Sequence, residues 1–220
     1  MTYLISTLIF AVVGTAQLNI FEIEGIFSNA HINALEGHIE EYEYTDDDLL
    51  ILQYSSQEGS AESIEELNSL LSGYDFPIGV WFGPYKISID FKQLNNFDYI
   101  GFSPGLEINN VSFDESVEKK YCTINICNFE ERKIIVSTNE GIYDNYLIVG
   151  TLGSFIENID FVISDQSIEF FKPSLFERFY IAISNPIFTY MFFVLGFALI
   201  GLELFAIGPG LMAVVGSLLV

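Results

Sequence analysis

Basic residues are scarce in this chain. Its 220 residues include 8 lysines and arginines against 30 aspartates and glutamates, a formal net charge of −22. Binding to nucleic acid or to an anionic lipid surface needs clustered lysine and arginine. The composition therefore argues against both partners. The acidic run EEYEYTDDD (40–48) is interpreted as solvated surface.

Cysteine and histidine are sparse too, with two residues of each. Cys122 and Cys127 lie five residues apart in a segment with the alternation of a strand, so their side chains would point to opposite faces. We therefore expect neither a disulfide nor a metal site there. His31 and His38 share one expected helix and have no second pair of ligands nearby. Both are predicted to be surface or boundary residues, and no cofactor is expected.

Long apolar runs occur at both ends of the chain, and the mean hydropathy is high for a soluble domain, at +0.39. The first run, residues 3–13, precedes the small residues Gly14 and Ala16, which is the pattern of a secretory signal. Residues 1–16 are therefore interpreted as a signal peptide. An uncleaved anchor or a buried strand stays open, because no lysine or arginine precedes the run.

The second long run, residues 187–207, has about the length that crosses a bilayer, which predicts a transmembrane helix. The turn GPG follows it, and then ten apolar residues, too few to span a membrane. We interpret 208–220 as a turn and the start of a second transmembrane segment. It belongs either to a longer membrane protein or to a half-hairpin.

Strand and helix patterns alternate between the two apolar ends. Strands are predicted over 18–25, 48–54, 77–82 and 98–105. Apolar residues at helical spacing predict two helices between them: Ile32, Leu35, Ile39 and Tyr42, and then Ile64, Leu67, Leu70 and Leu71. Ser28 or Asn29 is the expected N-cap of the first helix, and Ser60, at the end of the polar loop SSQEGS (55–60), that of the second. This order predicts an α/β domain with parallel strand pairing.

Several stretches are similar to motifs of one known family. The segment IEGIF resembles its EGxI motif, LLILQYSSQEGSAES a strand that leads into a TPGG loop, and DYIGFSPGLEIN a strand that ends in APGTxIG. TNEGIYDNYLIVG (138–150) resembles a helix and strand late in the family's domain. The apolar run, its single glutamate and the Pro-Gly turn near the carboxyl end resemble the family's membrane spans. The chain thus resembles the long form of the NfeD family, membrane-bound proteins of the ClpP class.

The resemblance implies an α/β extracytoplasmic domain of the ClpP/crotonase fold with a parallel sheet over 17–172, followed by a linker at 173–186. It also implies a signal peptide and carboxyl-terminal transmembrane helices. It also implies a membrane location and a homo-oligomer, with peptide segments of membrane proteins as partners. Active members resemble other Ser/Lys proteases, in which a serine attacks the amide and a neutral lysine takes its proton. Backbone N–H groups of a glycine-rich loop stabilise the oxyanion.

Matched position by position, the family's nucleophile falls on Ser88 in YKISID, although local alternation makes Ser88 a solvent-facing strand residue. The base falls on Lys119, with Lys120 and Lys133 as rivals, and the residues after Lys119 have the pattern of a strand where the family has a helix. The oxyanion loop includes Glu58 and Gly59.

Two departures from the family pattern add carboxylates where negative charge would develop. Asp90 stands two places after Ser88, and Glu58 replaces a glycine of the oxyanion loop. Both are electrostatically unfavourable for acyl transfer. We therefore expect a catalytically degenerate, NfeD-like serine protease homologue that acts as a membrane-associated binding or scaffold protein. The alternative is an active Ser/Lys endopeptidase that cleaves apolar segments of membrane-associated proteins.

Overall fold

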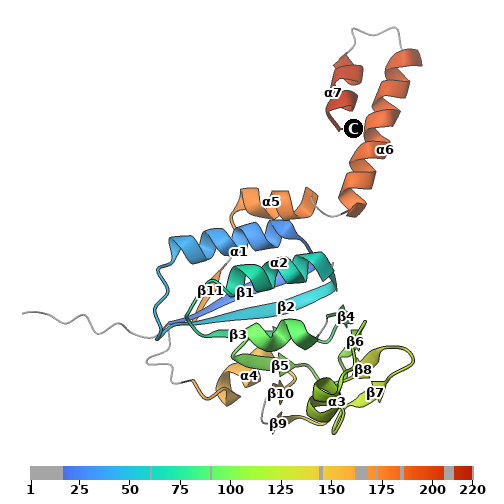
Figure 1. Cartoon of the computed structure of the whole chain (residues 1–220). Helices are drawn as coiled ribbons and strands as arrows, with labels where there is room; N and C mark the ends of the chain where they lie inside the picture. Colours follow the sequence, from blue (N-terminus) through green and yellow to red (C-terminus); the bar gives the residue numbers. More distant parts are fainter. Residues whose placement is uncertain are drawn as a thin grey trace, which may run out of the picture.

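The computed structural model describes residues 17–59, 61–89, 91–143, 146–161, 168–171, 173–183, 186–205 and 211–219. The predicted signal peptide and the candidate cap Ser60 lie outside these residues, and so does Asp90. The larger of two sheets has seven strands in the order β11-β1-β2-β3-β5-β10-β9, and all its neighbours are parallel except β10 and β9. The predicted α/β domain with a parallel sheet is therefore confirmed (Figure 1).

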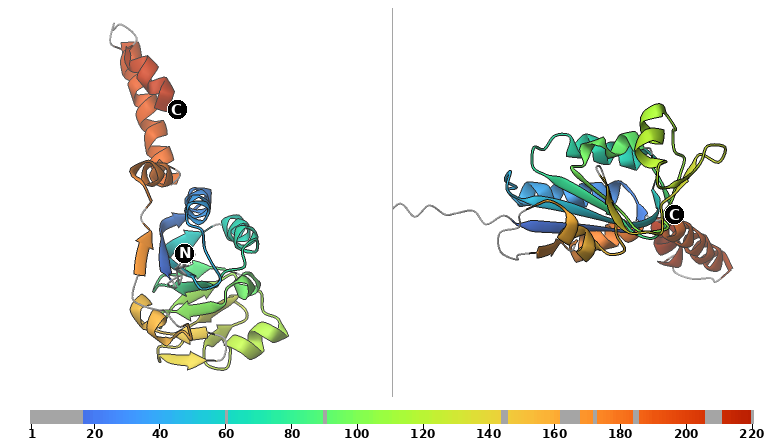
Figure 2. Two further views of the ribbon diagram at one scale, coloured as in Figure 1. Left: turned by 90° about the vertical axis from the view of Figure 1, so that its left-hand side faces the viewer. Right: turned by 90° about the horizontal axis from the view of Figure 1, so that it is seen from below.

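The strands of the larger sheet are β1 (Leu18–Phe27), β2 (Leu49–Gly59), β3 (Ile78–Phe82), β5 (Tyr99–Phe102), β9 (Gly141–Tyr143), β10 (Tyr146–Ile148) and β11 (Ile168–Phe171). On one face lie α1 (Asn29–Glu41), α2 (Ala61–Leu71) and the 3-10 helix η1 (Phe91–Asn96), and on the other lies α4 (Leu152–Asn158) (Figures 1 and 2). All four strands predicted from apolar runs are present. By contrast, the stretch 138–150 resembled a helix and a strand, but its residues 141–143 and 146–148 are the antiparallel strands β9 and β10.

The central strands are buried on both faces, as their continuous apolar sequences predict. Leu50 and Leu52 of β2 belong to a core shared with α1 and α2, whereas Leu49 and Ile51 belong to a second core that contains Phe155 of α4. Each of the two helical layers is therefore held by alternate residues of the same strands.

The prediction of a polar loop over 55–60 is wrong for residues 55–59, because β2 continues to Gly59. Ser56 is fully buried in β2, and its hydroxyl donates to the Gly25 carbonyl at 2.5 Å and accepts from the Phe27 N–H at 3.2 Å. The register of β1 and β2 shifts between Gly25 and Ile26, and Gly25 has a φ of 77°. Ser56 thus satisfies backbone groups at a β-bulge, which lets a polar sequence continue as a strand.

Helix α1 begins after Ser28, one of its two predicted N-caps. The prediction for His31 is wrong: it is buried, at 3% exposure, and its Nε2 lies 3.0 Å from the Glu24 carbonyl oxygen. Burial lowers the pKa of His31. His38 is half-buried, as a boundary residue should be, and packs on Phe171 with ring centroids 4.0 Å apart. Burial also lowers the pKa of His38.

The smaller sheet lies beyond the carboxyl ends of the parallel strands (Figure 1). Its order is β4-β6-β8-β7, from the strands β4 (Ile87–Ser88), β6 (Glu107–Asn109), β8 (Lys133–Ile135) and β7 (Ile126–Asn128). Beside it lies the short helix α3 (Glu115–Tyr121). Asp114 caps this helix, because its carboxylate accepts from the backbone N–H groups of Ser116 and Val117.

Three helices end the described chain: α5 (Leu175–Ile183), α6 (Pro186–Phe205) and α7 (Leu211–Leu219). Helices α6 and α7 lie side by side and project away from the sheets (Figures 1 and 2). They approach so closely that a Cβ on Gly216 would lie 2.7 Å from the Gly196 carbonyl oxygen. Within the described residues, no single helix has both the length and the apolarity of a membrane span. The bent pair formed by α5 and α6 passes that test together, on length and composition.

Replacing Gly101 by alanine should destabilise the domain. An added Cβ would lie 2.5 Å from the Phe155 ring and 2.8 Å from the Trp81 ring, with both rings packed in the core. Overpacking of this kind costs about 1–3 kcal/mol. As a matched control, a Cβ at Gly37 on α1 would meet nothing within 4 Å, and Gly37→Ala should gain about 0.5–1 kcal/mol from helix propensity. Denaturant unfolding of the detergent-solubilised chain measures both, and equal effects would contradict the packing described here.

The stability of the fold should fall as the pH drops from 7 towards 5. The chain has two histidines, and burial lowers the pKa of both in the folded state. The unfolded chain therefore binds more protons below about pH 6.5, which favours unfolding. Urea midpoints against pH should show this decline, and it should be weaker in His31→Gln. A profile that is flat over this range in the wild type would contradict the burial of these rings.

Candidate functional site

Ser88 lies in the edge strand β4, paired with Asn109 of β6. Its neighbours Ile87 and Ile89 are buried and Ser88 is half-buried, so the predicted strand alternation is confirmed. The Ser88 hydroxyl oxygen accepts a hydrogen bond from the Asn110 side-chain amide at 2.6 Å. An amide cannot take a proton from serine, so this contact positions the hydroxyl without activating it.

Arg132 fixes the turn that carries Asn110. Its guanidinium donates to the carbonyl oxygens of Val111 at 3.2 Å and Asn110 at 3.4 Å, and to the Ser112 hydroxyl at 3.3 Å. Asn110 and Arg132 both have left-handed backbones, with φ of 59° and 52°. Asparagine adopts this region more readily than most residues, which accounts for its place directly after β6.

The three candidate lysines lie in different surroundings. Lys119 is exposed in the last turn of α3, whereas the resemblance placed the base at the start of a helix. Lys120 is half-buried, with its amine 5.1 Å from the centroid of the Tyr121 ring. Burial lowers the pKa of Lys120. Lys133 lies across the small sheet, in an ion pair with Glu107.

Glu107 is the charged centre of the small sheet. One of its carboxylate oxygens lies 2.9 Å from the Lys86 amine and 3.0 Å from the Lys133 amine. Glu107 lies in β6, Lys133 lies in the neighbouring strand β8, and Lys86 directly precedes β4, which is the neighbour of β6 on its other side. Hydrogen bonds from Lys86 and then Lys133 lower the pKa of Glu107. Lys133 is thus engaged by a carboxylate on the same sheet that carries Ser88.

Glu58 and Gly59 form the end of β2, where they pair with Ile26 and Phe27 of β1. The backbone at these two positions therefore belongs to the sheet, whereas the resemblance predicted a glycine-rich loop. The carboxyl end of β2, strand β4 and helix α3 all lie at one end of the domain (Figure 1).

Sequence reasoning missed three residues around Ser88: Asn110, Arg132 and Glu107. Consecutive asparagines at 109 and 110 are a recognisable turn signal, and this signal could have marked the end of β6. Nothing in the local sequence pairs Glu107 with Lys86 and Lys133, because that contact depends on the order of strands in the smaller sheet.

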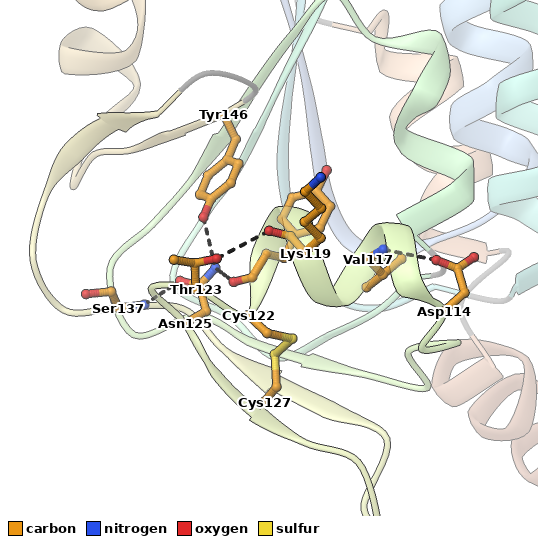
Figure 3. The surroundings of a disulfide bond; sticks show 10 residues. Asp114, Val117, Lys119, Cys122, Thr123, Asn125, Cys127, Ser137 and Tyr146 are labelled. Atoms are coloured by element: carbon orange, nitrogen blue, oxygen red, sulfur yellow. Dashed lines mark hydrogen bonds between the residues drawn. A yellow bond between two sulfur atoms is a disulfide. The ribbon is translucent and has the colours of Figure 1, made fainter.

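The expectation that the two cysteines stay apart is wrong. Cys122 and Cys127 form a disulfide with their Cα atoms 5.6 Å apart (Figure 3). Cys122 is the C-cap of α3 and Cys127 lies in β7, so a turn separates them and strand alternation does not apply. Asn125 fixes this turn, because its amide donates to the Tyr121 carbonyl at 2.9 Å and accepts from the Ser137 N–H at 2.9 Å.

A parallel sheet covered on both faces, with a small sheet at its carboxyl end, defines a mixed α/β domain whose fold resembles that of solved membrane-bound proteases. One similar solved structure is a lysine-to-alanine mutant of the 1510-N membrane-bound stomatin-specific protease, in complex with a substrate peptide. It shares 9% identity with this chain at a TM-score of 0.51, covering 78% of this chain and 99% of the other. A second is 1510-N itself, a membrane protease specific for a stomatin homolog from Pyrococcus horikoshii. Its identity is 11% at a TM-score of 0.50, covering 78% of this chain and 100% of the other.

The likeness is one of fold. No protein-family model matches the chain, and no curated protein matches it by sequence. At these identities the shared architecture carries over, but the roles of individual residues do not.

Removing the disulfide should destabilise the end of α3. In the chain-entropy account, a loop this short contributes about 2 kcal/mol. We expect the double variant Cys122→Ala/Cys127→Ala to lose about that much unfolding free energy. Reductant should lower the wild type to the same level and leave the variant unchanged. Labelling of Cys122 or Cys127 by a thiol reagent in the unreduced, denatured protein would contradict the pairing.

Proposed function

We propose that this chain is a membrane-associated protein of ClpP-like fold that has lost catalysis and binds peptide segments of membrane proteins. The observation that carries the proposal is the hydrogen bond from Asn110 to Ser88. Among the described residues, no lysine amine is bonded to the Ser88 hydroxyl. The hydroxyl of the candidate nucleophile is therefore hydrogen-bonded to an amide, whereas a Ser/Lys protease pairs its serine with a lysine base.

The energetic cost of these departures supports the loss of catalysis. A single missing oxyanion donor slows acyl transfer by about 100- to 1000-fold, and a missing base has a comparable or larger effect. Three features here oppose catalysis. The Ser88 hydroxyl is bonded to an amide, Lys133 is held in an ion pair with Glu107, and Glu58 and Gly59 have strand conformation. Together these features leave little rate enhancement, whereas a binding role requires only the fold.

The proposed location is a membrane, with the soluble domain on the extracytoplasmic side. The apolar helices α6 and α7 support membrane association, and Cys122–Cys127 supports the extracytoplasmic side, since structural disulfides persist in oxidising compartments. A homo-oligomer follows as part of the same proposal. The solved structures of similar fold are membrane proteases, one of them bound to a substrate peptide, and a peptide partner is the corresponding proposal here.

An active Ser/Lys endopeptidase is the second candidate function, and Lys120 is the observation in its favour. Burial lowers the pKa of Lys120, which increases the neutral amine available to act as a base. Its residue type and its place at the same end of the domain as β4 suit that role. Catalysis would then require an approach of Lys120 to Ser88.

Incubation of the detergent-solubilised chain with an apolar peptide separates the two candidates. We expect no cleavage by the wild type, by Ser88→Ala or by Lys120→Gln, read by mass spectrometry. The same peptide, labelled with a fluorophore, should bind all three forms with equal affinity by anisotropy. Cleavage that Ser88→Ala abolishes would establish the endopeptidase instead. Absence of binding to every form would overturn the peptide-binding role.

A further inference from the structure

Helix α5 presents large apolar side chains to its surroundings. Its sequence LFERFYIAI has two charged residues, Glu177 and Arg178, and the rest is apolar or aromatic. Leu175, Phe176 and Phe179 are 82%, 87% and 62% exposed. A contiguous exposed cluster of this kind marks a surface that meets an apolar partner.

The aromatic side of α5 faces α1 across an open groove of about 490 Å³. Phe176, Phe179, Tyr180 and Ile183 line it from α5, at the spacing of one helix face. From α1 the lining includes the small residues Ala30 and Ala34. These short side chains leave the rings of α5 without close packing, so the groove is apolar and open to the outside.

The direction of the following helix indicates what meets this surface. Helix α6 starts three residues after α5 ends, and the two axes are bent by 76°. Figure 1 shows α5 lying along α1 while α6 and α7 leave the domain steeply. If α6 enters a bilayer along its normal, α5 and the groove lie nearly parallel to the bilayer surface.

The charges select the kind of lipid. Glu177 and Arg178 cancel within α5, and α1 carries the exposed carboxylates of Glu36, Glu40 and Glu41. With a net charge of −22 over the chain, an anionic surface would repel the domain. Phenylalanine and tyrosine side chains with few charges suit the headgroup region of a zwitterionic bilayer.

We propose that α5 is an in-plane interfacial helix that seats the domain on a zwitterionic bilayer, with lipid filling the groove between α1 and α5. The proposal rests on the membrane association proposed above, and it makes 173–183 a membrane-surface element where part of a linker was expected. It fixes the orientation of the domain, with α1 towards the bilayer and α4 away from it. The predicted site, at the carboxyl ends of the strands, then lies at a side of the domain that faces neither towards the bilayer nor directly away from it.

Depth-dependent quenching tests the proposal on the full chain reconstituted into phosphatidylcholine vesicles. A single cysteine carrying the environment-sensitive fluorophore NBD is placed in α5 by Phe179→Cys. Two matched controls carry it in α6, by Val194→Cys, and in α4, by Glu157→Cys. The native cysteines are joined in the disulfide and do not compete for the label. Quenchers are iodide in water and lipids brominated near the headgroup or deep in the acyl chain.

We expect the label at 179 to be quenched most by shallow bromine and to be protected from iodide, whereas the label at 157 is quenched by iodide alone. The label at 194 should be quenched most by deep bromine. If the label at 179 is quenched by iodide alone, like the label at 157, while the label at 194 is quenched by brominated lipid, α5 lies in water. The proposal then fails, although membrane association stands. If 194 meets no lipid, membrane association itself fails.

Three further outcomes would also overturn the assignment. Deep quenching at 179, equal to that at 194, would make α5 part of a bent membrane span. Protection of 179 from both iodide and bromine would place a second copy of the chain on the groove. Shallow quenching that appears only when anionic lipid is added would show that the surface does not select zwitterionic lipid.

Discussion

The pairing of β1 with β2 is the interaction on which the rest of the structure depends. The two strands are in register from Leu18 opposite Leu49 to Phe27 opposite Gly59, with one bulge after Gly25. Their apolar side chains fill both cores, so α1 and α2 must cover one face and α4 the other. Because the strands are parallel, their carboxyl ends lie together, and the small sheet that carries Ser88 lies at that end. The same pairing extends β2 through Glu58 and Gly59.

Hydrogen bonds and ion pairs stabilise the surroundings of Ser88, and they also limit its chemistry. Arg132 holds the Asn110 turn, Asn110 donates to the Ser88 hydroxyl, and Glu107 draws Lys86 and Lys133 together over the same sheet. Each of these polar groups has a hydrogen-bond or ion-pair partner that stabilises the local fold. Catalysis has the opposite requirements. A serine nucleophile must donate its hydrogen bond to a proton acceptor, and a lysine base must have a neutral amine. The surroundings of Ser88 thus have the character of an ordinary polar surface.

The four central parallel strands and α1 and α2 could be predicted because continuous apolar runs and helical spacing are local properties of the sequence. The failures arise where tertiary contacts or turns override the local pattern. His31 is buried because Glu24 and Phe27 of β1 enclose it, and 55–59 is a strand because Ser56 bonds to the β1 bulge. The disulfide was missed because α3 runs as far as Tyr121, which strand alternation did not anticipate. Of the candidate site, Ser88 was found through the resemblance, whereas Asn110 and Glu107 required the sheet order.

The surroundings of Ser88 leave its hydroxyl unactivated, although the fold of the domain resembles that of solved membrane proteases. Reaction with a fluorophosphonate tests this most directly, because the reagent phosphonylates a serine oxygen with loss of fluoride only when the hydroxyl is unusually nucleophilic. The intact, solubilised chain is treated with the reagent, and the peptide that contains Ser88 is examined by mass spectrometry. The account predicts that Ser88 stays unmodified under conditions that label a working serine protease completely. A phosphonyl adduct on Ser88 would contradict it.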